Sequence, residues 1–141
     1  SRLLSVYKQY AISKWQEKED LDYVLDIIKR KHPEMYSLAK KYLRGKKGYF
    51  CNMFIMKKDI FNDYSKWLFG ILEEHEKSKD FSKYSVEKYR VSGYLAERLC
   101  GIYLTYLKKQ KNSLKALLTM FTLFLASSCA FAGEAKPRTL W

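Results

Sequence analysis

The sequence is poor in the residues that break helices, cross-link small folds or bind metals. Its 141 residues include only 2 prolines, 6 glycines, 3 cysteines and 2 histidines. Cys51, Cys100 and Cys129 show no CxxC spacing, so neither a disulfide framework nor a zinc site of common spacing is indicated. The scattered glycines form no GxGxxG motif or P-loop, and no nucleophile elbow occurs. His32 and His75 lack ligand-like spacing, and we predict that both lie at the surface.

Acidic residues are also few compared with basic ones. There are 27 lysines and arginines against 15 aspartates and glutamates, which gives a net charge of +12 and a pI near 9.5. Such a balance favours contact with nucleic acid, anionic membranes or phosphate-bearing ligands. The lysines are dispersed along the chain, so we interpret them mainly as a solvated surface and predict no specific nucleic-acid partner.

The apolar content excludes a disordered chain. Hydrophobic residues make up 48% of the sequence and aromatic residues 16%, enough for one domain with a core. Apolar residues recur at helical spacing in several stretches, with Pro33 suited to open one helix, Gly45 to end it and Asp59 to cap the next. The predicted helices cover residues 20–30, 33–45, 59–76 and 85–108.

A short apolar stretch, Tyr49 to Met56, contains one residue that needs explanation. The stretch is bounded by Gly48 and Lys57, and it predicts a strand buried on both faces. Asn52 lies inside it, and a buried amide needs hydrogen-bond partners. Either a ligand or a loop backbone supplies them. A single strand is not stable alone, so either the rest of its sheet lies outside this chain or the stretch is not a strand.

The predicted helix 85–108 carries a second stripe beside its core face. Arg90, Gly93, Glu97 and Gly101 follow one another at i, i+3, i+7 and i+11. Each glycine costs a helix about 1 kcal/mol relative to alanine. Close approach by a backbone or a ligand explains that cost. The alternative is that the glycines fit a helix crossing while Arg90 pairs with Glu87.

The C-terminal stretch follows a different pattern from the rest. Residues 108–115 are basic, residues 116–132 are almost all apolar or small, and Ala130-Phe131-Ala132 resembles a signal-peptidase site. We favour a signal-peptide-like reading, with a membrane span over 114–132 or a buried helix as alternatives. We therefore divide the chain into residues 1–107 and a tail, 108–141.

Three further segments of the sequence form a recognisable series, at residues 52–58, 64–72 and 90–99. Taken in this order, they resemble the C-terminal half of the DUF4422 family, a group of bacterial glycosyltransferase-like proteins linked to capsular polysaccharide and exopolysaccharide synthesis. The resemblance covers about residues 6–107. It implies a mostly helical α/β fragment with one short buried strand, the C-terminal part of a GT-A-like nucleotide-sugar transferase.

The resemblance also implies roles for single residues. Asn52 is expected to hydrogen-bond sugar hydroxyls, and Arg90 to pair with a donor phosphate. Glu97 is the expected catalytic residue, orienting an acceptor hydroxyl or acting as base. Gly93 and Arg98 are expected to contact substrate on the same helix. The implied partners are a nucleotide-sugar donor and a polysaccharide acceptor, and whether a divalent metal is needed stays open.

One short motif is relevant to the metal question. Asp20-Leu21-Asp22 has the DxD spelling with which many nucleotide-sugar glycosyltransferases hold a divalent metal. Here it opens a helix, where acidic residues favour the dipole, so we predict no metal site. The implied location is cytoplasmic, at the inner face of the membrane. The competing hypotheses are a basic helical binding module for polyanions and a protein anchored through residues 114–132.

Overall fold

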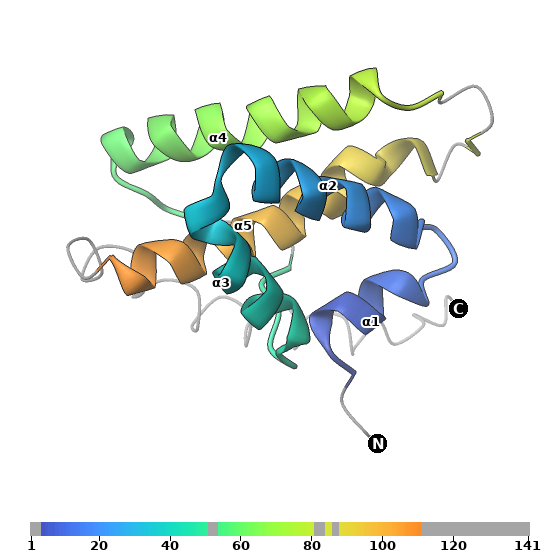
Figure 1. Cartoon of the computed structure of the whole chain (residues 1–141), viewed down its shortest axis with the longest axis horizontal. Coiled ribbons are helices and arrows are strands. Elements are labelled where there is room, and N and C mark those ends of the chain that lie inside the picture. The colour runs from blue at the N-terminus through green and yellow to red at the C-terminus, as the bar shows by residue number, and fades with distance from the viewer. Residues whose placement is uncertain (1–3, 51–53, 81–83, 86–87, 111–141) are drawn as a thin grey trace, which may run out of the picture.

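The computed structural model describes residues 4–50, 54–80, 84–85 and 88–110, and every regular element within them is helical (Figure 1). Its elements in chain order are α1 (Val6–Ala11), α2 (Lys18–Lys31), α3 (Pro33–Arg44), α4 (Lys58–Lys77), the 3-10 turn η2 (Lys88–Arg90) and α5 (Val91–Lys109).

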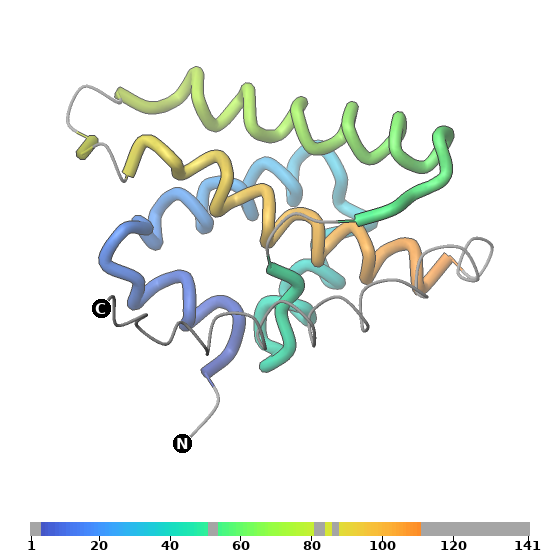
Figure 2. The backbone as a smooth tube through the Cα atoms, turned by 180° about the vertical axis from the view of Figure 1, so that it is seen from behind, coloured from blue at the N-terminus to red at the C-terminus, as the bar shows by residue number. Residues whose placement is uncertain are grey.

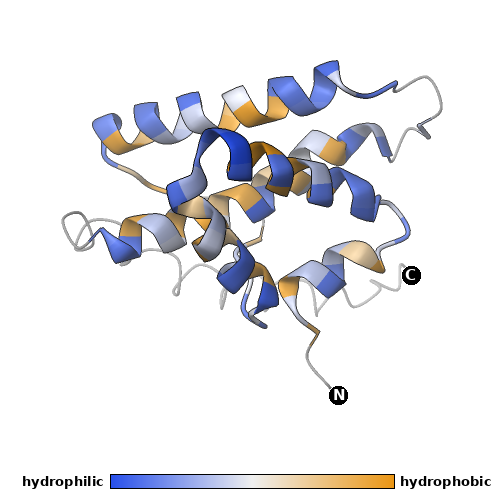
Figure 3. Ribbon diagram, in the orientation of Figure 1, coloured by the Kyte–Doolittle hydropathy of each residue, from blue (hydrophilic) through white to orange (hydrophobic). Residues whose placement is uncertain are grey.

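Helix α5 is the centre of the fold. It packs against α2, α3 and α4, while α2 also contacts α3 and α4, and α1 contacts α2 and α3. Figures 1 and 2 show α4 and α5 side by side and running in opposite directions. The apolar faces of the helices turn towards one another and their polar faces turn outward (Figure 3).

The buried residues follow the helical periodicity of the sequence. On α4 they recur at three- and four-residue steps, so a single apolar stripe packs against α2 and α5. The buried residues of α4 are Ile60, Tyr64, Trp67, Leu68, Ile71, Leu72 and His75. The predicted core stripe of α5 is also buried at Val91, Leu95, Leu99 and Ile102.

Helix ends follow their predicted signals in part. Pro33 occupies the first turn of α3 and Gly45 ends that helix, as predicted. The prediction that Asp59 caps α4 is wrong, because the cap residue is Lys57. Asp59 instead lies in the first turn, where its carboxylate interacts favourably with the helix dipole. Helix α5 begins at Val91, later than predicted, because η2 precedes it.

The predicted strand over residues 49–56 is not found in the part of that stretch that the structure describes, residues 49–50 and 54–56. The Tyr49 N–H donates to the Tyr42 hydroxyl at 3.0 Å rather than to a neighbouring strand. Phe54 packs edge-on against Tyr64, with ring centroids 5.3 Å apart, and Ile55 is 59% exposed. The segment is therefore an irregular, aromatic-rich stretch packed on the helices. The prediction of an α/β fold is wrong for the described residues, which form a helical fold.

A neighbouring side chain fills the space where a side chain of residue 101 would lie, which explains the glycine there. A Cβ atom at this position would lie 2.1 Å from the ring of Tyr42, which crosses α5 from α3. No atom lies within 4 Å of a Cβ built on Gly93. Close approach thus explains Gly101, and the approaching group is a side chain. It does not explain Gly93.

We predict that Gly101→Ala destabilises the fold. Tyr42 is buried and accepts a hydrogen bond from Tyr49, so its ring has little freedom to retreat. Overpacking of this kind costs about 1–3 kcal/mol, more than the gain of up to about 1 kcal/mol that alanine brings to a helix. Urea unfolding measures the change.

Gly70→Ala is the matched control, because nothing lies within 4 Å of its Cβ position on exposed α4 surface. It should stabilise the protein by about 0.5–1 kcal/mol. If both variants change stability in the same direction, the close approach at Gly101 is not the reason for its glycine.

Candidate functional site

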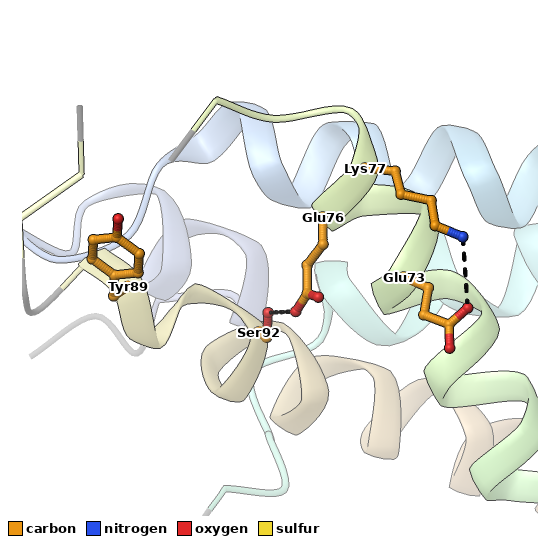
Figure 4. Close-up of a pocket in the computed structure, with 5 residues that line it drawn as sticks. All are labelled: Glu73, Glu76, Lys77, Tyr89 and Ser92. Carbon is orange, nitrogen blue, oxygen red and sulfur yellow. Dashed lines mark hydrogen bonds and ion pairs between the residues drawn. The ribbon is translucent and has the colours of Figure 1, made fainter. Parts of the chain in front are cut away.

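A polar pocket lies between the end of α4 and the start of α5. It encloses about 420 Å³ and is lined by Glu73, Glu76, Lys77, Tyr89 and Ser92 (Figure 4). The Ser92 hydroxyl donates to Glu76 at 2.7 Å, which ties the two helices together at the pocket. Carboxylates, an ammonium, a hydroxyl and an aromatic ring are the groups that hydrogen-bond and stack on sugars.

Two of the predicted substrate residues, Arg90 and Gly93, lie in the same short segment as two of the residues that line this pocket. Arg90 stands between the lining residues Tyr89 and Ser92 in the sequence, and its side chain is exposed. Its guanidinium carbon lies 5.9 Å from the centroid of the Tyr94 ring. Gly93 follows Ser92 and leaves open space beside the helix. The sequence thus predicted Arg90 and Gly93 as substrate residues, whereas the residues that line the pocket were not predicted.

Glu97 and Arg98 lie further along α5 and are joined to each other. Arg98 Nη1 donates to Glu97 Oε2 at 2.7 Å and to the Tyr94 carbonyl at 3.3 Å. The Arg98 side chain is 6% exposed and that of Glu97 is 21% exposed. The carboxylate of Glu97 is thus held by a buried arginine and still reaches the surface.

Aromatic rings surround the Arg98 guanidinium. Its central carbon lies 5.1 Å from the Tyr10 ring and 5.2 Å from the Phe50 ring. Burial lowers the pKa of Arg98, and the Glu97 carboxylate opposes this effect. Arg98 Nε finds no acceptor among the described residues. Cation–π contact therefore replaces water as part of its solvation.

Phe50 also brings the segment that precedes Asn52 to α5. Asn52 itself lies outside the described residues, so its expected hydrogen bonds stay a prediction. The structure therefore brings Glu97 and Arg98 together. At 1.5 Å per residue, Gly93 lies about 6 Å before Glu97 on α5, and Arg90, at the end of η2, about 10 Å before it. Asn52 is not described.

The prediction of a surface position for His75 is wrong, because the side chain is fully buried against Asp20. His75 Nε2 lies 2.9 Å from Asp20 Oδ1, Lys79 Nζ lies 3.0 Å from the same oxygen, and the Tyr84 hydroxyl lies 3.2 Å from both carboxylate oxygens. The Asp20 carboxylate thus joins α2 to the end of α4 and to the chain beyond it.

Burial and neighbouring groups shift the pKa values of Asp20 and Tyr84 in this cluster. Burial alone would raise the pKa of Asp20, but hydrogen bonds from His75 and Lys79 outweigh burial and hold it below its usual value. Burial and the nearby Asp20 charge raise the pKa of Tyr84 to about 12. The Asp20 carboxylate is therefore ionised and hydrogen-bonded. We interpret the cluster as one that stabilises the fold.

The two carboxylates of the DxD motif do not converge. Asp20 points into the core, whereas Asp22 accepts a hydrogen bond from Tyr7 at 2.6 Å and pairs with Lys18 at 3.2 Å. Residues two apart on a helix face in different directions. Within the described ranges, no group of three or more His, Cys, Asp or Glu side chains is placed to hold a metal ion.

The chain belongs to the DUF4422 family, described as a domain of unknown function, whose family model matches residues 2–111. It is also similar in structure to part of a larger enzyme. The apo structure of the WbbM bifunctional glycosyltransferase aligns with a TM-score of 0.74 and 34% sequence identity, over 80% of this chain and 20% of WbbM. No curated protein matches the chain.

None of the helices that the structure describes is long and apolar enough to cross a membrane. The stretch 114–132, for which a span was the alternative prediction, lies outside the described residues.

Proposed function

We propose that this chain is the C-terminal part of a glycosyltransferase that transfers a sugar from a nucleotide sugar to a polysaccharide precursor. The single observation that supports this most is the likeness, at 34% identity, to part of the WbbM bifunctional glycosyltransferase. Because the aligned region is 20% of WbbM, we expect the nucleotide-binding elements to lie in polypeptide outside this chain. We expect no transfer by this chain alone.

In this proposal the start of α5 faces the donor. The pocket beside it presents Glu76, Tyr89 and Ser92 to sugar hydroxyls. Arg90, which stands between the lining residues Tyr89 and Ser92 in the sequence, is exposed and carries the charge that would pair with a donor phosphate. Gly93 would contact the substrate on the same stretch of helix.

The second part of the proposal concerns the acceptor. Glu97 would orient the acceptor hydroxyl or remove its proton, a task that needs a positioned and accessible carboxylate. Arg98 positions it, through the 2.7 Å hydrogen bond, and is itself held by Tyr10 and Phe50. Asn52, two residues after Phe50 in the sequence, would contact the sugar.

The test uses a complete DUF4422 glycosyltransferase with substitutions equivalent to Glu97→Gln and Asn52→Leu. We expect Glu97→Gln to lower kcat roughly 100-fold or more, the usual contribution of a general base, with a far smaller change in donor KM. Asn52→Leu should abolish transfer and leave the far-ultraviolet circular dichroism unchanged.

The matched control is the equivalent of Glu19→Gln, which makes the same chemical change on the exposed surface of α2. Its turnover should stay within about twofold of wild type, since surface changes rarely matter. Full turnover in the Glu97→Gln enzyme would refute the base assignment, and full turnover in Asn52→Leu would refute the sugar contact.

A further inference from the structure

Helix α5 packs against α3 (Figure 2). A second groove is lined by residues from α3, the segment that follows it and the C-terminal end of α5. It encloses about 810 Å³. Its lining consists of five lysines and a few small, apolar or aromatic residues. These residues are Leu38, Lys41, Tyr42, Gly45, Lys46, Lys47, Thr105, Lys108 and Lys109.

The groove carries positive charge that nothing in the described structure neutralises. All five lysines are exposed, and none pairs with a carboxylate of the described residues. The sequence explains why. No aspartate or glutamate occurs between Glu34 and Asp59, or between Glu97 and Glu134. Both walls of the groove therefore come from acid-free stretches.

Two of the lining residues, Tyr42 and Lys108, contact an aromatic ring outside the lining, that of Tyr49. Tyr42 packs over Gly101 and stacks on Tyr49, with ring centroids 6.3 Å apart. Lys108 Nζ donates to the Tyr49 hydroxyl at 2.6 Å and lies 5.1 Å from the ring centroid. Tyrosine beside lysine combines an apolar ring, a polar tip and a charge, a combination suited to a membrane–water interface.

We propose that this lysine groove docks on an anionic phospholipid surface. This interaction is separate from sugar transfer, and the surface lies at the opposite end of α5 from the sugar pocket. Lysine ammonium groups act as mobile point charges, which suits a fluid layer of headgroups. The groove lining contains no arginine, the residue whose planar fork suits fixed phosphates in nucleic acid or a bound nucleotide. Each lysine near an anionic bilayer adds to the attraction.

The test is co-sedimentation of the full chain with vesicles of phosphatidylcholine alone or mixed with phosphatidylglycerol. Wild type should bind the mixed vesicles more tightly, and added salt should weaken that binding. Lys46→Glu/Lys47→Glu should weaken it roughly 30-fold or more, from the known contribution of two lysines at such a surface.

Lys57→Glu/Lys58→Glu is the matched control, an adjacent exposed lysine pair outside the groove with the same change in net charge. It should bind within a few-fold of wild type. Residues after 110 are common to all three proteins, so their contribution cancels. Both variants should keep the far-ultraviolet circular dichroism of wild type, since none of these four exposed side chains forms an ion pair with a described carboxylate.

Three results would overturn the proposal. Equal loss in both variants would mean that net charge alone drives binding. No loss in the Lys46→Glu/Lys47→Glu chain would place binding outside the groove. Release of vesicle-bound protein by inorganic pyrophosphate or duplex DNA, at constant ionic strength and at lower phosphate concentration than the lipid, would show that the groove prefers a soluble phosphate ligand. None of these readouts depends on sugar transfer.

Discussion

Asp20→Ala is expected to destabilise the protein by about 3–5 kcal/mol, because removal of one partner from a buried ion pair leaves the others without compensation. The carboxylate is fully buried and receives hydrogen bonds from His75, Lys79 and Tyr84. Without it, a buried imidazole, an ammonium and a hydroxyl lose their shared acceptor. Urea unfolding at neutral pH measures the loss.

The same carboxylate makes stability depend on acid. The folded-state pKa of Asp20 lies below its usual value, so its stabilisation is complete above the unfolded pKa of about 3.9 and is lost as the pH falls through the folded value. Asp20→Asn keeps the shape without the titration, so the part of acid destabilisation due to Asp20 should disappear in that variant.

Asp22→Ala is the matched control for Asp20→Ala. Its carboxylate is 42% exposed and pairs with Lys18 on the helix surface, where such pairs contribute about 0.3–0.5 kcal/mol; the Tyr7 hydrogen bond adds about 1 kcal/mol. A loss in Asp20→Ala no larger than in Asp22→Ala would mean that the buried cluster does not hold α2 to α4.

Trp67→Ala should cost about 3–5 kcal/mol, the usual range for removal of a large aromatic side chain from a core. Trp67 is buried on α4, with its ring centroid 5.2 Å from that of Tyr103 and 6.2 Å from that of His32. The substitution leaves a cavity where α4 meets α5 and the start of α3. Urea or thermal unfolding measures the change.

Two variants test the reason for that loss. Trp67→Phe should cost much less, because it keeps most of the ring contacts and removes an indole N–H that has no acceptor among the described residues. Phe69→Ala, at a site 58% exposed on the same helix, should change stability by about 0.5 kcal/mol or less. A Trp67→Ala loss as small as that of Phe69→Ala would contradict the core position.

The helices were predictable because their apolar residues repeat at helical spacing, and this pattern survives in the buried stripes of α2, α4 and α5. His75 was missed because glutamates flank it in the sequence. Its position gave a usable signal, since it follows Ile71 by four residues and Leu72 by three, on the buried stripe of α4. A histidine on such a stripe needs a buried partner, and Asp20 is that partner.

The strand prediction failed for a different physical reason. Short apolar runs do not distinguish a buried strand from other buried segments. Here the Tyr42 hydroxyl satisfies the Tyr49 amide, and the aromatic side chains pack on helices. Neither contact leaves a trace in the local sequence. The lining of the pocket between α4 and α5 was also beyond prediction, because Glu73 and Ser92 come together only when the two helices pack.

Helix α5 has the pocket that we propose for sugar near its start and the lysine groove near its end, so the length of the helix sets the distance between them. Ser92 lines the first and Lys108 the second, and a helix rise of 1.5 Å per residue sets them about 24 Å apart along the axis. If both proposals hold, phosphate headgroups at the groove would be too far away to touch a sugar in the pocket. An acceptor anchored in the same bilayer would then need a reach of several sugar units, so the length of its chain would decide which acceptors are extended.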